Sequence, residues 1–223
     1  MTDCFLVVYL QDGVGINFNN YLPINNDRIM DYNDLILQQN KLQKEGNIIL
    51  EKLELLKFLS KYGKPVITGS LATGLMTWRD IDIELVDETK SSKNLFDTVN
   101  YLFEIDNIKN IQLNNNIGGR IRANNPDGLY LGFQYQDQEL WKIDIWFIYN
   151  EKQHSGKDDV LWFKNNINEE QRKSILIIKN QMAVHPKYRK TVFSTDIYDA
   201  VLKENIRNYD GFIEYLKNKD KYL

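Results

Sequence analysis

Apolar and polar residues alternate in several short stretches in the middle of the chain, as they do in strands with one buried face. Residues 66–68 and 81–86 predict two short strands, and "LWKIDIWFIY" (140–149) has the clearest strand pattern of the chain. "GGRIRANN" (118–125) and "GLYLGFQYQ" (128–136) predict two further strands, joined by the turn signal Asn-Pro-Asp-Gly. The middle of the chain is therefore expected to form a sheet.

Leucine and isoleucine recur at helical spacing before this sheet. The spacing predicts a helix that begins near Asp31 or Asn33 and continues to about residue 59. Gly46 is expected to bend or split this helix, and Gly63 is expected to be its C-cap residue. At the start of the chain, residues 5–10 predict a strand, and the asparagine-rich residues 17–27 predict a loop.

Helical patterns also follow the second strand and dominate the end of the chain. An amphipathic helix capped by Ser91 or Ser92 is expected after the second strand. Beyond Asn150 the expected helices are residues 167–182, capped by Asn168, residues 194–206 and residues 209–219. We therefore expect an α+β domain over residues 1–150, which includes the N-terminal helix, and a helical region over residues 151–223.

Composition narrows the class of protein. Apolar residues make up 43% and charged residues 26% of the 223 residues, which is ordinary for a globular protein. A net charge of -3 disfavours a long nucleic acid as partner. A single cysteine, Cys4, predicts no internal disulfide and fits a reducing cytoplasm. His154 and His185 stand far apart in sequence and in unlike contexts, so a zinc site built on them is not expected. No apolar run is long enough for a membrane helix, so a cytoplasmic protein without membrane contact is expected.

Carboxylates interrupt two of the predicted strands. Because alternate side chains of a strand share a face, Asp80 and Asp82 would lie on one face and the isoleucines between them on the other. Two neighbouring carboxylates repel each other unless they are solvated or neutralised, and Mg²⁺ is a common neutraliser because it prefers carboxylate oxygens. Asp144 has the same setting in its own strand, so it would join Asp80 and Asp82 if the two strands are neighbours.

A Gly-Ser pair precedes these acids at the end of the strand that begins at Val66. Gly69 allows the backbone to approach a ligand closely, and Ser70 at a helix start offers a hydroxyl and free amide groups to a phosphate. Gly74 keeps the following turn uncrowded. A phosphate-binding turn one strand away from a carboxylate pair predicts a site for a metal ion and a triphosphate.

Together these residues resemble the motif of the nucleotidyltransferase superfamily built on the DNA polymerase β-like palm. The motif has Gly-Ser, then Asp-x-Asp at the start of a strand, and a third Asp on a later strand, which match Gly69, Ser70, Asp80, Asp82 and Asp144. The resemblance covers about residues 66–148. Thr73 and Arg79 depart from the arginine and serine that many small-molecule members carry near the turn and before the first Asp.

The resemblance implies a fold and a reaction. The fold would be a nucleotidyltransferase palm, with a mixed β-sheet flanked by helices and followed by a C-terminal helical region. Asp80, Asp82 and Asp144 would be the catalytic and metal-binding residues for Mg²⁺, with Mn²⁺ as an alternative, and Gly69 and Ser70 would bind the NTP. A nucleoside monophosphate would pass to a hydroxyl of an acceptor, with release of pyrophosphate, in a site between the palm and the helices.

The acceptor and the class of activity stay open at this point. The acidic composition favours a small molecule or a protein hydroxyl as acceptor over a long nucleic acid. The same palm occurs in toxins that modify tRNA or protein and in nucleotide-second-messenger synthases. A non-catalytic binding module or antitoxin is the alternative of another class. Arg79, Arg120, Arg122 and Lys179 are candidates to bind the leaving pyrophosphate.

Histidine and aromatic residues carry weaker signals. His185 is expected to be a cation at a helix C-terminus, with a substrate contact as the alternative. Trp78 and Trp146 are expected to pack in the core, with stacking on a base as the alternative, and Tyr130 is expected to pack within the sheet. The basic run at residues 185–190 is expected to be a solvated face.

Overall fold

A computed structural model describes residues 30–119, 125–150 and 156–221. Its sheet has five strands in the order β1-β2-β5-β4-β3, namely β1 (Pro65–Thr68), β2 (Asp80–Val86), β3 (Ile108–Asn115), β4 (Gly128–Gln136) and β5 (Leu140–Ile148). Only β2 and β5 are parallel, and the other neighbours are antiparallel. The expected α+β fold with a mixed sheet is confirmed.

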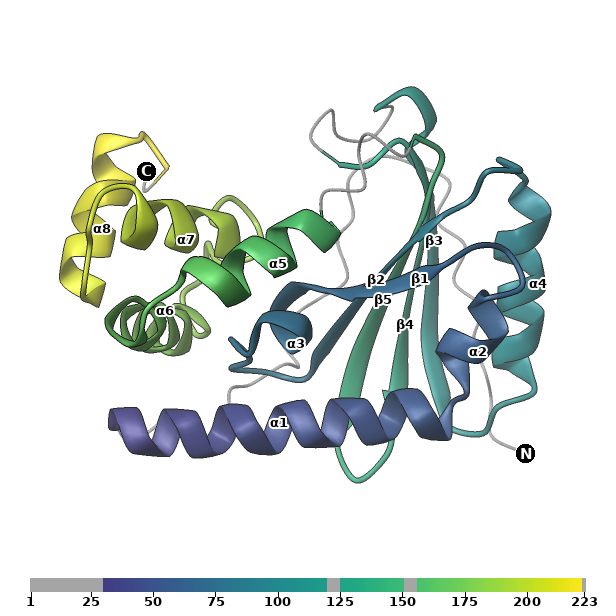
Figure 1. Ribbon diagram of the computed structural model, residues 1–223, viewed down its shortest axis with the longest axis horizontal. Helices are drawn as coiled ribbons and strands as arrows, with labels where there is room; N and C mark the ends of the chain where they lie inside the picture. The colour runs from purple at the N-terminus through teal and green to yellow at the C-terminus, as the bar shows by residue number, and fades with distance from the viewer. Residues whose placement is uncertain (1–29, 120–124, 151–155, 222–223) are drawn as a thin grey trace.

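One face of the sheet is covered by helices and forms the larger core. The helices are α1 (Tyr32–Lys52), α2 (Leu55–Leu59) and α4 (Ser92–Phe103), as Figure 1 shows. Every second residue of β2, Ile81, Ile83 and Leu85, is buried in this core. The alternation therefore leaves Asp80 and Asp82 on the opposite face, as expected.

The helices after the sheet form a second core. They are α5 (Gly156–Asn166), α6 (Glu169–Met182), α7 (Ser194–Leu202) and α8 (Tyr209–Asn218), and Figure 1 shows them grouped beside the sheet. The expected cap of α6 is confirmed, since Asn168 accepts from the amide of Gln171 and the Gln171 side chain accepts in return. None of the described helices has the length and hydrophobicity that a membrane span requires.

Helix α1 belongs to both cores. Its first turns contribute Leu35 to the helical core, and its later turns contribute Leu42 and Ile49 to the sheet core. The two parts of the chain therefore share α1, and a domain boundary at residue 150 stays a prediction.

Two expectations about the first helix are wrong. Gly46 lies inside α1, which continues unbroken through it to Lys52, and a Cβ there would be only 3.2 Å from Leu71 and 3.3 Å from the ring of Trp141. The helix instead breaks at Glu54, whose backbone is left-handed, and α2 ends at Leu59 with Ser60, not Gly63, as its C-cap residue. Gly63 has a different role, since a Cβ there would overlap the carbonyl oxygen of Val86 at the end of β2.

The start of one expected strand is not a strand, and one strand was missed. Gly118 and Gly119, the start of the expected strand over residues 118–125, lie in a 3₁₀ turn, and residues 120–124 are outside the described residues. The partner of β4 is β3, whose residues "IKNIQLNN" are too polar to predict a strand. The strand and loop expected over residues 5–27 also lie outside the described residues.

The sheet core yields a stability prediction. Ile143 of β5 is fully buried, so Ile143→Ala leaves a cavity and should lower the free energy of unfolding by about 2–5 kcal/mol. Ile48 of α1 is 51% exposed, and Ile48→Ala should cost less than about 1 kcal/mol. Urea denaturation of both variants compares the two values, and equal losses would contradict the placement of the core.

Candidate active site

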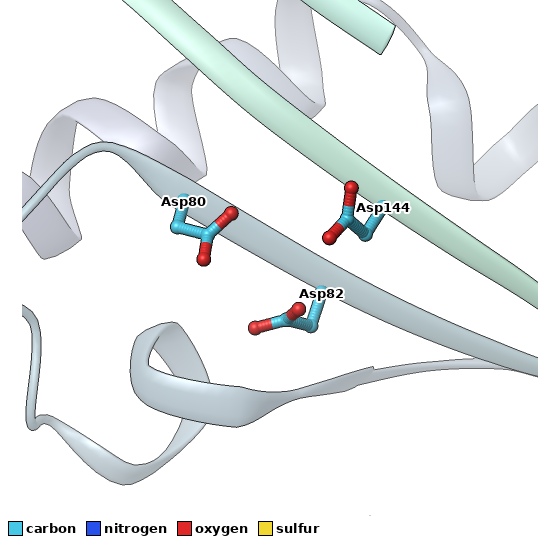
Figure 2. A group of neighbouring side chains, drawn as sticks. All are labelled: Asp80, Asp82 and Asp144. Atoms are coloured by element: carbon cyan, nitrogen blue, oxygen red, sulfur yellow. The ribbon is translucent and has the colours of Figure 1, made fainter. Parts of the chain in front are cut away.

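Strand pairing brings the three predicted acids together. In the parallel register of β2 and β5, Asp82 lies beside Asp144, and Asp80 precedes Asp82 by two residues on the same face. Figure 2 shows the three side chains pointing toward one another over the two strands. Each carboxylate offers an oxygen within 4.8 Å of the others, and the side chains of Asp80 and Asp144 are only 17% and 13% exposed.

The Gly-Ser turn packs directly on this group. Gly69 begins the short helix α3 (Gly69–Thr73) with a positive φ of 61°, and a Cβ at this position would overlap Oδ2 of Asp82. Glycine is therefore required both by the backbone conformation and by the close approach to the carboxylate. Ser70 is buried beside Gly69 in the same helix. Their proposed role in binding a triphosphate stays a prediction.

Positive charge offsets Asp80. Burial alone would raise the pKa of Asp80, but the charges of Lys142 and Arg189 and a hydrogen bond from Trp78 Nε1 hold it below its usual value. Lys142 Nζ lies 3.7 Å from Asp80 Oδ1, and Arg189 Nη2 lies 4.0 Å from Asp80 Oδ2. Asp80 is therefore ionised within the group.

The other two acids are less well compensated. Burial, reinforced by the charges of Asp80 and Asp144, raises the pKa of Asp82 to about 8. Burial also raises the pKa of Asp144, although Lys142 forms an ion pair with it and the Tyr130 hydroxyl donates to it over 2.8 Å. Burial and the neighbouring carboxylates therefore favour the protonated form of Asp82, and a cation bound beside it would favour the ionised form.

The three acids fit a divalent metal ion. Asp80 Oδ1 is buried and has no hydrogen-bond donor among the described residues. A buried carboxylate oxygen left in this way is costly, and a cation bound there would satisfy it. Three carboxylates form a hard oxygen donor set suited to Mg²⁺ or Mn²⁺. The metal-binding role itself stays a prediction.

Cations and aromatic rings reach the acids from the helical part of the chain. The Lys179 ammonium of α6 lies 4.7 Å above the ring of Trp78, and the Arg189 guanidinium lies 4.3 Å from the same ring. The Trp78 ring also packs edge-on against Tyr188. Lys179 was a candidate from the sequence, whereas Arg189 lies in the basic run expected to be a solvated face and is here only 20% exposed.

Several other candidates have different partners. Arg79 forms ion pairs with Glu45 and Glu139, and Arg120 and Arg122 are outside the described residues. Burial and the charge of Lys187 lower the pKa of His185, which disfavours the expected helix-end cation.

The aromatic candidates divide between packing and the site. The ring of Trp146 packs 5.1 Å from that of Tyr130, in line with a packing role. The Tyr130 hydroxyl contacts Asp144, which the strand pattern alone did not indicate. Trp78 was expected to pack, and it does so while also donating to Asp80.

No family model and no curated protein sequence matches the chain. Solved structures do match. A cytoplasmic RNA terminal U-transferase shares 15% identity at a TM-score of 0.54, with 74% of this chain and 49% of that chain covered. A structure of the Cid1 poly(U) polymerase with Mg and 3'-dATP shares 18% identity at the same TM-score, with 73% and 49% covered.

Another Cid1 poly(U) polymerase structure has 16% identity and a TM-score of 0.52, with 79% of this chain and 56% of that chain covered. At such identities the likeness shows the fold, and the expected nucleotidyltransferase fold is confirmed. The chain spans about half the length of these structures.

The close contact between Gly69 and Asp82 yields a prediction with a matched control. Gly118 also has a positive φ, but a Cβ there meets nothing within 4 Å, so Gly118→Ala should cost only about 1–2 kcal/mol of backbone strain. Gly69→Ala adds the overlap with Asp82 and should lower the free energy of unfolding by a further amount of about 1–3 kcal/mol. Chemical denaturation measures both, and equal costs would contradict the packing of the turn on Asp82.

Lys179 yields a prediction for pH. Burial lowers its pKa to about 7, and its ammonium donates to the carbonyl oxygen of Leu75 over 2.7 Å. The unfolded chain binds this proton up to the ordinary lysine pKa of about 10.4, so between these values the unfolded state holds more protons and stability rises with pH.

The Lys179→Met variant removes this contribution. The difference in unfolding free energy between wild type and variant should therefore shift in favour of wild type from pH 7 to pH 10, by up to about 1.4 kcal/mol per pH unit. Part of the shift near pH 8 comes from Asp82, whose pKa of about 8 itself depends on the charge of Lys179. A difference independent of pH would contradict its lowered pKa.

Proposed function

We propose that the protein is a metal-dependent nucleotidyltransferase that moves a nucleoside monophosphate from an NTP to a hydroxyl of an acceptor. The observation that carries the proposal is the convergence of three partly buried carboxylates beside the Gly-Ser turn. The fold of solved nucleotidyltransferases supports the same reaction class.

Different side chains of the site would bind the metal ions, accept the proton and position the acids. Asp80, Asp82 and Asp144 would hold divalent cations, which supply charge neutralisation for the triphosphate and for both oxygens of an in-line displacement. Asp144, hydrogen-bonded to Tyr130, is placed to accept the proton of the acceptor hydroxyl. Trp78 holds Asp80 in position through its indole N–H.

The leaving group needs positive charge of its own. A bond forms between the acceptor oxygen and the α-phosphorus, the bond from that phosphorus to the bridging oxygen of the β-phosphate breaks, and pyrophosphate leaves. Arg189, which lies beside Trp78 and 4.0 Å from Asp80, is the described cation best placed to receive it from the helical side, since Lys179 is only 1% exposed and donates to the carbonyl oxygen of Leu75. Gly69 and Ser70 would hold the β- and γ-phosphates at the start of α3.

A small molecule is our first candidate for the acceptor. A net charge of -3 provides no general attraction for a long polyanion. The 3'-hydroxyl of RNA is the second candidate, because the solved structures of this fold include proteins named as an RNA terminal U-transferase and a poly(U) polymerase. A cytoplasmic location remains part of the proposal.

Pyrophosphate release tests the reaction. Wild type with Mg²⁺ or Mn²⁺ and each NTP in turn should release pyrophosphate when an acceptor is present. Asp82→Asn, which removes one ligand, should lose activity on the order of a thousandfold. Asp137→Asn is a matched control, since Asp137 pairs with Lys52 in the turn between β4 and β5 and should keep wild-type activity.

The acceptor arms of the same assay separate the alternatives. Release that depends on an RNA oligonucleotide, and stops when its 3' end is deoxygenated, would favour RNA over a small molecule. Release with a panel of small hydroxyl compounds alone would favour the first candidate. NTP binding without release under any of these conditions would contradict turnover and favour a non-catalytic binding module.

A further inference from the structure

A lysine lies among the three acids on the same face of the sheet. Lys142 precedes Asp144 by two residues on β5, and the parallel register pairs it with Asp80 on β2. Lys142 and the three aspartates therefore occupy two adjacent pairs across the β2–β5 junction, Asp80 with Lys142 and Asp82 with Asp144. The motif of acids alone does not require a cation at this position.

The Lys142 ammonium contacts two of the three acids. It forms an ion pair with Asp144 Oδ2 and lies 3.7 Å from Asp80 Oδ1. Its side chain is 11% exposed, so water screens these charges little. The ammonium is thus a fixed positive charge between these two carboxylates.

A divalent ion held by the same oxygens needs the same space. Mg²⁺ binds oxygen at about 2.0–2.1 Å, so an ion shared by Asp80 and Asp144 would lie close to the position of the ammonium. Two cations at such a distance repel strongly in a site from which water is mostly excluded. The lysine stem has four flexible carbons, so the ammonium can leave the acids while the strand stays in place.

We propose that Lys142 is a built-in counter-ion that occupies the metal position of the acids and that a divalent metal must displace it to bind. Lys142 compensates the acids while metal is absent and lowers their affinity for metal. The Lys142 ammonium leaves Asp80 and Asp144 only when a divalent metal ion binds there. The proposal rests on the metal site of the proposed function and adds a determinant of its affinity.

The test measures binding of Mn²⁺ alone, with no nucleotide, at pH 8.0 so that protons compete less for the acids. Free Mn²⁺ is followed by electron paramagnetic resonance for wild type, Lys142→Met, Lys142→Gln and Lys142→Arg. Removal of the competing charge should tighten Mn²⁺ binding about tenfold or more in the Met and Gln variants. The Arg variant keeps the charge and should bind within about threefold of wild type.

A matched lysine elsewhere serves as control. Lys52 pairs with Asp137 at an exposed position, so Lys52→Met should leave Mn²⁺ affinity unchanged. The melting temperature without metal should fall in the Met and Gln variants of Lys142, because three buried acids lose a counter-ion, and their stabilisation by Mn²⁺ should exceed that of wild type. Unchanged or weaker Mn²⁺ binding in folded Met and Gln variants would overturn the proposal.

A wild-type measurement covers the case in which these variants do not fold. In protein labelled with ¹³Cε-lysine, the signal of Lys142, assigned by its loss in Lys142→Arg, should shift on addition of Mg²⁺ as the ammonium leaves Asp144. A Lys142 signal unchanged at saturating Mg²⁺ would overturn displacement.

Asp82→Asn keeps the failure of this proposal distinct from that of the proposed function. Equal Mn²⁺ binding by wild type and Asp82→Asn would contradict the metal site itself, and with it both proposals. Loss of binding in Asp82→Asn together with unchanged affinity in Lys142→Met would contradict the counter-ion alone.

Discussion

Mutual repulsion of three partly buried carboxylates is the constraint around which this site is built. Asp80, Asp82 and Asp144 approach within 4.8 Å at positions mostly shielded from water. Such a group cannot remain ionised without nearby positive charge, because each carboxylate raises the energy of the others. The protein supplies that charge from the sheet through Lys142 and from beyond α6 through Arg189. Even so, burial and the two neighbouring carboxylates raise the pKa of Asp82 to about 8, so a further cation beside it would favour its ionised form.

The fold supplies the geometry that this constraint requires. A parallel pairing of β2 with β5 places Asp82 beside Asp144, although the two residues are far apart in the chain. The isoleucines between the acids anchor both strands in the core, so the carboxylates cannot separate to relieve their repulsion. Gly69 packs against Asp82, where the Cβ of any larger residue would overlap the carboxylate. The helical region contributes the cations and rings on the far side of Trp78.

Local patterns were enough to predict the acids and the turn. Asp80 and Asp82 alternate with isoleucine, and Gly69 and Ser70 directly follow a strand, so each signal lies within a few residues. The break at Glu54 was not predictable in this way, because it depends on how α1 and α2 pack against the sheet. Strand β3 was missed because its polar residues lie at the sheet edge, where pairing with β4 outweighs propensity.

The charge balance was the part that the sequence did not reveal. Arg189 contacts Asp80 from the loop after α6. The basic run alone does not indicate which of its residues points toward the acids. Lys142 was visible on the face of Asp144, but its contact with Asp80 depends on the register of β2 and β5. Non-local pairing therefore decides which charges meet, whereas local patterning decides only which face they occupy.

The most direct test of a metal-triphosphate site is crystallographic. Crystals of the wild-type protein grown with Mn²⁺ and a non-hydrolysable NTP analogue allow the metal to be located by its anomalous scattering. Our account predicts an anomalous peak bonded to carboxylate oxygens of Asp80, Asp82 and Asp144, with the analogue's phosphates completing the coordination beside Gly69 and Ser70. A peak at another position, or an analogue bound away from these acids, would contradict the account.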